Sequence, residues 1–198
     1  MLLEEALIIF LKYPEPGEVK TRLAREIGNY SAALFYRLFS EVVLKETSPC
    51  GFSRAIFFHP KEKEREIREW LGSDLEFYPQ EGKDLGERLF KAFEVVFKKG
   101  ANRAVAIGTD SPTIRKSVII EAFQMLKDRP CVLGPALDGG YYLLGLNSLH
   151  REIFKGISWG KHSVLERTQQ RLRRLGLRFS LVEPCPDVDT LKDLCLLK

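Results

Sequence analysis

Residues 103–113, RAVAIGTDSPT, place an aspartate directly after a short apolar run. The run 104–107 is typical of a strand buried on both faces, and Gly108 and Pro112 end it. Asp110 is therefore expected just past the carboxyl end of a central strand, where open α/β sheets bind ligands. A carboxylate there suits Mg²⁺ carrying a phosphate group. The same aspartate could instead cap the next helix or form a turn, and this segment alone leaves both interpretations open.

Three cations gather where the first predicted strand leads into a helix. The apolar run 6–11 predicts a buried parallel strand, and the PEPG that follows excludes regular structure. Helical spacing resumes near Lys20. Lys12, Lys20 and Arg22 are thus expected beside backbone N–H groups at a helix start, an arrangement that favours an anion. We favour phosphate binding over the alternative of a solvated basic loop, because Lys supplies point charges and Arg binds two oxygens at once.

Two further segments combine glycine with charge. In QEGKDLGERL, Gly86 allows a ligand to approach the backbone closely, and Arg88 falls in the first turn of a helix that continues over 89–97. A positive side chain there opposes the helix dipole unless an anionic ligand is bound. The alternative, a cap by Asp84 with a surface arginine, is equally open.

The other segment is LDGGYYLLGL. Asp138, Gly139 and Gly140 form a strong turn signal before the strand-like run 141–146. Spacing alone favours a plain hairpin turn, although Asp138 could add a carboxylate to a site.

The last acidic pair, Asp187 and Asp189, follows a strand predicted over 177–182. The strand ends therefore bring cations at 12, 20 and 22 and carboxylates at 110, 138, 187 and 189 to one edge of the sheet. The cations could bind phosphate groups, and the carboxylates could bind Mg²⁺. Such a combination is typical of enzymes that transfer phosphoryl or nucleotidyl groups. Neither GxGxxG after the first strand nor GxxxxGK[ST] occurs, which disfavours a dinucleotide oxidoreductase and a P-loop kinase.

The elements that must position these residues alternate between strands and helices. Alternation predicts an α/β fold, a three-layer α/β/α sandwich with a mostly parallel sheet. A chain of 198 residues suits one such domain, residues 1–198, since no linker or repeat divides it. A helix over 30–45 carries a broad apolar stripe that we expect in the core, made of Ala33, Leu34, Phe35, Leu38, Phe39, Val42 and Val43.

Composition excludes several classes of protein. The net charge of +4 is mild, and the arginines of the predicted helix near 164–175 lack interleaved aromatic residues, so nucleic-acid binding is not expected. The four cysteines and three histidines show no metal-ligand spacing. The first apolar run is too short to span a bilayer and lacks a basic leader. We expect a reduced, cytoplasmic protein without a membrane span.

The ordered motifs FLKYPEPGEVKTRLA, DLGERL, GTDSPT, LGPALDGGYYLLGL and DVDTLKDL cover nearly the whole chain. Together they resemble a family of small bacterial proteins with the glycosyltransferase-A fold, often labelled radical-SAM/selenodomain-associated transferases. That family is similar to the 2-phospholactate guanylyltransferases and, more distantly, to the molybdenum-cofactor nucleotidylyltransferases. The resemblance implies the nucleotide-diphospho-sugar transferase architecture, which is Rossmann-like.

The resemblance also implies roles for matching positions. Asp110 and Asp189 resemble the metal ligands, for Mg²⁺ or Mn²⁺, and Asp138, Gly139, Gly140 and Tyr141 correspond to the acceptor side. The residues expected to bind the nucleotide are Lys12, Pro16, Gly17, Lys20, Thr21, Arg22, Gly86, Arg88, Gly108 and Thr109. The proline-bearing PEPGEVK replaces the glycine-rich LAGGxGxRMG loop of related enzymes, so the nucleotide base is left open.

Nucleotidyl transfer is the function we predict from these residues. A phosphate or carboxylate acceptor would attack a nucleoside triphosphate, and Lys20 and Arg22 would neutralise the departing pyrophosphate. The alternative is glycosyl transfer from a nucleotide sugar, with Asp138 as the acceptor-side base. A third possibility is a nucleotide-binding protein without catalysis. For either enzyme, the expected partners are a nucleoside triphosphate or nucleotide sugar and a small-molecule acceptor.

Overall fold

The computed structural model of the protein describes residues 4–48, 51–72 and 75–194. Strands in this part of the chain form one sheet in the order β3-β2-β1-β4-β6-β5-β7. Their bounds are β1 Glu5–Lys12, β2 Ser53–His59, β3 Glu76–Pro79, β4 Arg103–Gly108, β5 Cys131–Pro135, β6 Tyr141–Leu146 and β7 Phe179–Leu181. All neighbours are parallel except β6, which runs antiparallel to β4 and to β5. The prediction of a mostly parallel sheet is confirmed.

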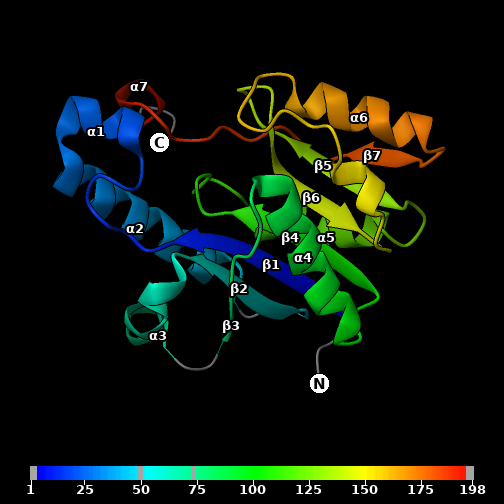
Figure 1. The fold of residues 1–198 in the computed structure, drawn as a ribbon, viewed down its shortest axis with the longest axis horizontal. Coiled ribbons are helices and arrows are strands. Elements are labelled where there is room, and N and C mark those ends of the chain that lie inside the picture. Colours follow the sequence, from blue (N-terminus) through cyan, green and yellow to red (C-terminus); the bar gives the residue numbers. More distant parts are fainter. Residues whose placement is uncertain (1–3, 49–50, 73–74, 195–198) are drawn as a thin grey trace.

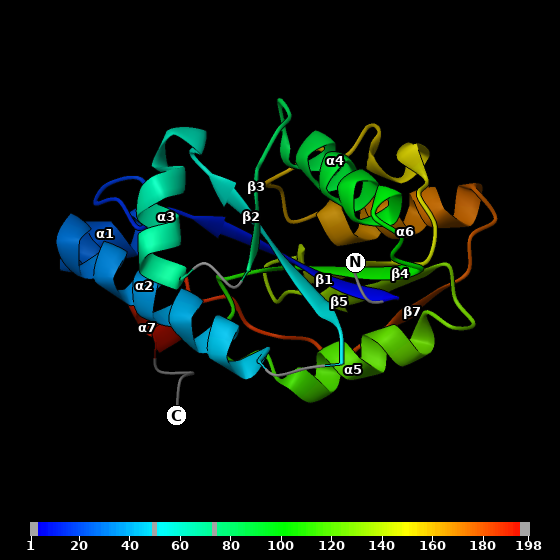
Figure 2. The ribbon, with the colours of Figure 1, turned by 90° about the horizontal axis from the view of Figure 1, so that it is seen from below.

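Helices cover both faces of this sheet, as Figures 1 and 2 show. The helices are α1 Thr21–Ile27, α2 Asn29–Glu46, α3 Glu64–Leu71, α4 Leu85–Lys98, α5 Lys116–Met125, α6 Val164–Arg174 and α7 Leu191–Leu194, with short 3₁₀ turns at Lys61–Lys63 and Arg151–Phe154. Side chains of α4 and α6 pack on one face, and those of α2, α3 and α5 pack on the other. The three-layer α/β/α arrangement is therefore also confirmed.

The unbroken apolar runs of the sequence explain why the central strands are buried on both faces. In β1, Leu7 and Ile9 pack toward α2 and α5, while Ala6 and Ile8 pack toward α4. All four side chains are fully buried. Such alternation requires apolar residues at every position, which is the pattern of a strand covered by helices on both sides.

The topology places β1 and β4 next to each other with their carboxyl ends at the same edge. Phe10 of β1 is in register with Gly108 of β4, so the loops that follow these two strands begin side by side. The chain leaves β1 toward α1 and leaves β4 toward α5. After β7, the chain runs back along this edge to α7, which packs beside α1 (Figure 1). Segments that are far apart in the sequence thus meet where α/β sheets bind ligands.

The expected core stripe of α2 is wrong in part. Ala33, Phe39 and Val43 are buried as expected, but Leu34, Leu38 and Val42 are exposed. Tyr36 and Ser40, which lie outside the expected stripe, are buried. None of the helices in the described part of the chain combines the length and the hydrophobicity that a membrane-spanning helix requires.

Candidate functional site

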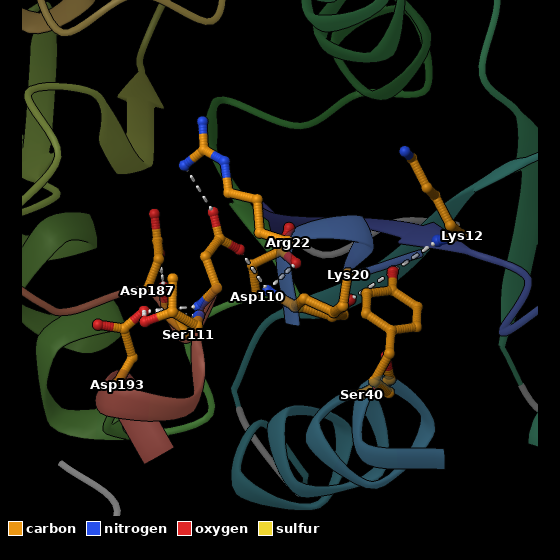
Figure 3. A network of polar contacts seen from close by, with 12 residues as sticks. Lys12, Lys20, Arg22, Ser40, Asp110, Ser111, Asp187 and Asp193 are labelled. Carbon is orange, nitrogen blue, oxygen red and sulfur yellow. Dashed lines mark hydrogen bonds and ion pairs between the residues drawn. The ribbon is translucent and has the colours of Figure 1, made fainter. Parts of the chain in front are cut away.

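Lys20 is a buried cation held between two carboxylates (Figure 3). Its Nζ lies 2.5 Å from Oδ1 of Asp110 and 3.0 Å from Oδ1 of Asp189, and its side chain is 2% exposed. Burial alone would lower the pKa of Lys20, but the charges and hydrogen bonds of Asp110 and Asp189 raise it above its ordinary value. Lys20 is therefore a charged ammonium at the carboxyl edge of the sheet.

The backbone of Lys20 is unusual as well. It adopts a left-handed conformation, with φ 47° and ψ 45°, at the position just before α1. Among the described residues, it is the one residue other than glycine with positive φ. Such a conformation costs free energy and persists where the surrounding structure enforces it, which is common at functional sites.

Asp110 lies where the sequence predicts it, directly after β4. Its side chain is about half exposed, and its backbone oxygen accepts a hydrogen bond of 3.2 Å from the N–H of Val188. That bond ties the segment containing Asp187 and Asp189 to the end of β4. Helix α5 begins at Lys116 with Arg115 as its N-cap residue, so the alternative that Asp110 caps this helix is excluded.

Asp189 is positioned by hydrogen bonds within the short turn before α7. Oδ2 of Asp193 accepts from the backbone N–H groups of Asp189 and Thr190. On the outer side, Nη1 of Arg22 lies 3.7 Å from Oδ2 of Asp189, and the Arg22 side chain is largely exposed. The structure thus brings Lys20, Arg22, Asp110 and Asp189 together, as the sequence predicts.

Asp187 is a further carboxyl group at this edge, where the strand ends predict it together with Asp110 and Asp189. Burial raises the pKa of Asp187 to about 6, and the charges of Asp110 and Asp138 add to the rise, although a hydrogen bond donated by Ser111 opposes it. Ser111 and Asp187 both lie in the wall of the cavity described below.

Tyr36 of α2 links the loops that follow β1 and β4. Its hydroxyl oxygen accepts hydrogen bonds from the backbone N–H of Lys12, at 2.8 Å, and from Oγ1 of Thr109, at 2.9 Å. Burial raises the pKa of Tyr36 above its ordinary value, so the phenol is neutral. Tyr36 thereby fixes the relative position of the two loops that carry Lys20 and Asp110.

Tyr36→Phe is expected to destabilise the protein by about 1–3 kcal/mol, because the buried hydroxyl of Thr109 and the backbone N–H of Lys12 lose their acceptor. Tyr30→Phe is the matched control, since Tyr30 lies on the same helix but is 83% exposed, and we expect a change within about 0.5 kcal/mol. Urea unfolding followed by circular dichroism measures both free energies. Equal values for the two variants would contradict the linking role of Tyr36.

A cavity of about 290 Å³ opens beside these charges. Its wall comes from the carboxyl ends of β1 and β4, the start of β6 and the first turns of α4. Six of the residues expected to act in the site lie in this wall: Lys12, Lys20, Arg88, Gly108, Asp110 and Tyr141. Tyr36, Gln80 and Ser111 are also in the wall, although the sequence does not predict them as site residues. Phe10 and Leu85 are among its apolar residues.

Gln80 has an identifiable structural role in that wall. Its Nε2 donates to the backbone oxygens of Leu11, at 3.2 Å, and Phe57, at 2.8 Å, near the carboxyl ends of β1 and β2. Its backbone N–H donates to the oxygen of Phe58. Gln80 is therefore held rigidly beside the strand ends.

Other predicted nucleotide-binding residues shape the site from outside the cavity wall. Gly17, with φ 91°, turns the loop after β1, and Pro16 and Thr21 are exposed beside it. Thr109 is buried and donates its hydroxyl hydrogen to Tyr36. Their binding roles stay predictions.

The start of α4 contains both a helix cap and an arginine in the cavity wall, the two alternatives that the sequence leaves open. Asp84 caps the helix by accepting from the N–H of Glu87 at 2.9 Å. Arg88 is half-buried in the cavity wall, with its Nε donating to the oxygen of Gly82 at 3.2 Å. Gly86 is packed against Trp159, because a Cβ at this position would lie 2.7 Å from the indole ring.

Asp138, Gly139 and Gly140 form the turn of the β5–β6 hairpin, which confirms the hairpin predicted from their spacing. Oδ1 of Asp138 accepts from the N–H of Gly140 at 2.8 Å. The turn packs against the loop before α6, where Nδ1 of His162 lies 2.5 Å from the backbone oxygen of Asp138. Asp138 itself is exposed and lies outside the cavity wall, while Tyr141 lies within it.

The pair Asp110 and Asp189 fits a hard divalent cation. Both carboxylates already contact one ammonium group, so their oxygens can also reach one small cation. Mg²⁺ is commonly bound by one or two carboxylates together with the phosphates of a substrate. The described residues contain no cluster of three or more His, Cys, Asp or Glu side chains arranged around a metal position. Two carboxylates would leave the other coordination positions of such a cation to phosphate oxygens and water.

Known proteins resemble this chain in both sequence and fold. The family model described as "Uncharacterized protein conserved in bacteria (DUF2064)" matches residues 45–161. A "putative nucleotide-diphospho-sugar transferase" from Desulfovibrio desulfuricans is 36% identical, with a TM-score of 0.94 over 98% of this chain and 86% of that one. No curated protein matches the chain.

Two more distant structures share the fold. The 4-diphosphocytidyl-2C-methyl-D-erythritol synthase of Anaerococcus prevotii is 7% identical, with a TM-score of 0.62 over 98% of this chain and 97% of that one. Rv0371c of Mycobacterium tuberculosis, in complex with manganese, is 13% identical, with a TM-score of 0.61 over 97% of each chain. The fold is that of the nucleotide-diphospho-sugar transferases.

Proposed function

We propose that this chain, which belongs to the DUF2064 family of proteins conserved in bacteria, is a nucleotidyltransferase. It would transfer a nucleotidyl group from a nucleoside triphosphate to a phosphate- or carboxylate-bearing small molecule and release pyrophosphate. The observation that carries the proposal is the meeting of Lys20, Arg22, Asp110 and Asp189 beside the cavity at the carboxyl edge of the sheet. One ligand in this cavity could therefore contact Lys20 and Arg22 through its phosphates and, through a bound metal, Asp110 and Asp189.

Lys20 and Arg22 would act on the triphosphate. An oxygen of the acceptor attacks the α-phosphorus, a new P–O bond forms, and the bond to the β-phosphate oxygen breaks so that pyrophosphate leaves. The ammonium and the guanidinium neutralise the charge that develops on this leaving group. No nucleophilic side chain is required, because positioning and charge stabilisation provide the catalysis.

Asp110 and Asp189 would hold Mg²⁺ or Mn²⁺, which supplies Lewis-acid stabilisation of the phosphate oxygens when bound. Rv0371c, which shares the fold, was crystallised in complex with manganese, and this supports the proposal of a divalent cation. The apolar wall beside Phe10 and Leu85, together with the fixed Gln80, supplies a surface against which a nucleotide base could pack. Asp138 and the glycines after it are proposed to form the acceptor side.

Glycosyl transfer from a nucleotide sugar is the second candidate. It is favoured by the name of the 36% identical structure, a "putative nucleotide-diphospho-sugar transferase". In this reaction Lys20 and Arg22 would hold the diphosphate of the leaving group, and Asp138 would act as the base toward the acceptor. The two candidates share the phosphate site and differ in the product that leaves.

The product that is released therefore distinguishes nucleotidyl transfer from glycosyl transfer. The protein is incubated with Mg²⁺, each nucleoside triphosphate and a panel of phosphorylated and carboxylated acceptors, and separately with sugar nucleotides. GTP with phosphorylated hydroxy acids comes first, because of the resemblance to the 2-phospholactate guanylyltransferases. Acceptor-dependent release of pyrophosphate is the expected result, whereas release of a nucleoside diphosphate from a sugar nucleotide would establish the second candidate. Thermal stabilisation by a nucleotide without any turnover would indicate a binding protein.

A further inference from the structure

The carboxylates that we assign to a metal are occupied by a side chain of the protein itself. The Lys20 ammonium lies 2.5 Å from Asp110 and 3.0 Å from Asp189. Figure 3 shows Lys20 directed toward Asp110. The Lys20 side chain is 2% exposed, so it is inserted between the acidic residues rather than resting on the surface. Its backbone adopts the left-handed conformation that places it there.

We propose that Lys20 and a divalent cation compete for Asp110 and Asp189, so that the metal binds well only after phosphate has drawn Lys20 away. This inference rests on the proposed function, because it concerns the same phosphate and metal site. Lys20 would then be the residue that makes metal binding depend on the nucleotide.

The competition follows from the size of the groups. An ammonium hydrogen-bonded to a carboxylate keeps its nitrogen about 2.7–2.9 Å from the oxygen, whereas Mg²⁺ binds oxygen at about 2.0–2.1 Å. A cation held by both carboxylates at the shorter distance would need the space that Lys20 Nζ fills. Electrostatic repulsion also opposes simultaneous binding, because the Lys20 ammonium and a divalent cation at one pair of carboxylates are both positively charged.

A phosphate ligand offers Lys20 another partner. Lys20 itself lines the cavity, together with Lys12 and Arg88, so an anion bound there lies within reach of its side chain. When the ammonium moves to phosphate oxygens, Asp110 and Asp189 become available to a cation. By linkage, nucleotide then strengthens metal binding and metal strengthens nucleotide binding by the same factor.

Mn²⁺ binding to the full chain without nucleotide tests this inference. The concentration of free Mn²⁺ is measured by electron paramagnetic resonance during titration of wild type, Lys20→Met and Lys12→Met. Methionine is unbranched like lysine and removes the charge. We expect Lys20→Met to bind Mn²⁺ at least about tenfold more tightly than wild type. We expect Lys12→Met, which loses the same charge from the same cavity wall, to change the affinity by less than about threefold, because its charge acts only at a distance.

Each outcome of the Mn²⁺ titration either supports or overturns the competition between Lys20 and the metal. Tighter binding in Lys20→Met that is lost when Asp110→Asn is added supports the competition. If wild type binds Mn²⁺ through Asp110 and Lys20→Met binds no more tightly, or if Lys12→Met gains as much, the competition is overturned while the proposed function stands. If no variant binds Mn²⁺, the proposed metal site is overturned as well. Circular dichroism checks the fold, and Lys20→Gln takes the place of Lys20→Met should the latter not fold.

Discussion

Asp110→Asn is expected to lower acceptor-dependent pyrophosphate release by about 10²–10³-fold, the effect of removing one electrostatic element from an active site. The amide keeps the size of the carboxylate but removes the charge that a metal ligand and a partner of Lys20 need. The fold is expected to persist, because Asp110 is about half exposed and Lys20 keeps its contact with Asp189.

Asp128→Asn is the matched control. Asp128 is exposed and lies just before β5, at the opposite edge of the sheet from Asp110. Pyrophosphate release is measured for both variants at saturating Mg²⁺, and thermal melting confirms that both are folded. An Asp110→Asn protein as active as the control would remove Asp110 from the proposed site.

Gly139→Ala is expected to lower the free energy of unfolding by about 3 kcal/mol or more. Gly139 has φ 89°, where an alanine costs about 1–2 kcal/mol. In addition, a Cβ there would lie 2.0 Å from the backbone oxygen of His162, so the hairpin turn or the loop before α6 must move. Because Asp138 precedes this glycine, the proposed acceptor side would be displaced together with the turn.

Gly160→Ala separates the cost of the positive φ from the cost of steric overlap with His162. Gly160 has φ 77°, but a Cβ at this position would meet no atom within 4 Å, so its substitution carries only the backbone cost of about 1–2 kcal/mol. Urea denaturation gives both free energies. If Gly139→Ala were no more destabilising than Gly160→Ala, the tight packing of the turn against His162 would be refuted.

The parts of the site that follow from strand ends could be predicted from the sequence. Asp110 comes directly after an apolar run, and Lys20 follows a loop stiffened by proline after another apolar run. Since parallel strands end at one edge, the two residues had to lie near each other once β1 and β4 were neighbours. Local sequence thus determines which residues reach the edge, and the sheet order determines which of them meet.

Tyr36 and the face of α2 could not be predicted in the same way. Leu34, Leu38 and Val42 follow a helical spacing and are exposed. Tyr36, Ser40 and Val43 follow a helical spacing too and are buried, although only Val43 belongs to the predicted stripe. Periodicity alone cannot decide between two such faces. The deciding interactions are long-range, namely the hydrogen bonds of the Tyr36 hydroxyl with Lys12 and Thr109.

The role of Gly86 could not be predicted from local sequence either. The sequence favours neither a ligand nor a cap near this glycine, and the contact that requires it to be small comes from Trp159, which is distant in the chain. A glycine selected for close packing against a side chain has the same local sequence as one selected for close approach of a ligand.

The most direct test of the central claim is a crystal structure of the protein with Mn²⁺ and a non-hydrolysable nucleoside triphosphate, with manganese located by anomalous scattering. We predict an anomalous peak between the carboxylates of Asp110 and Asp189, with the triphosphate oxygens contacting Lys20 and Arg22. Manganese and triphosphate bound elsewhere, with Lys20 still paired to both carboxylates, would contradict the account.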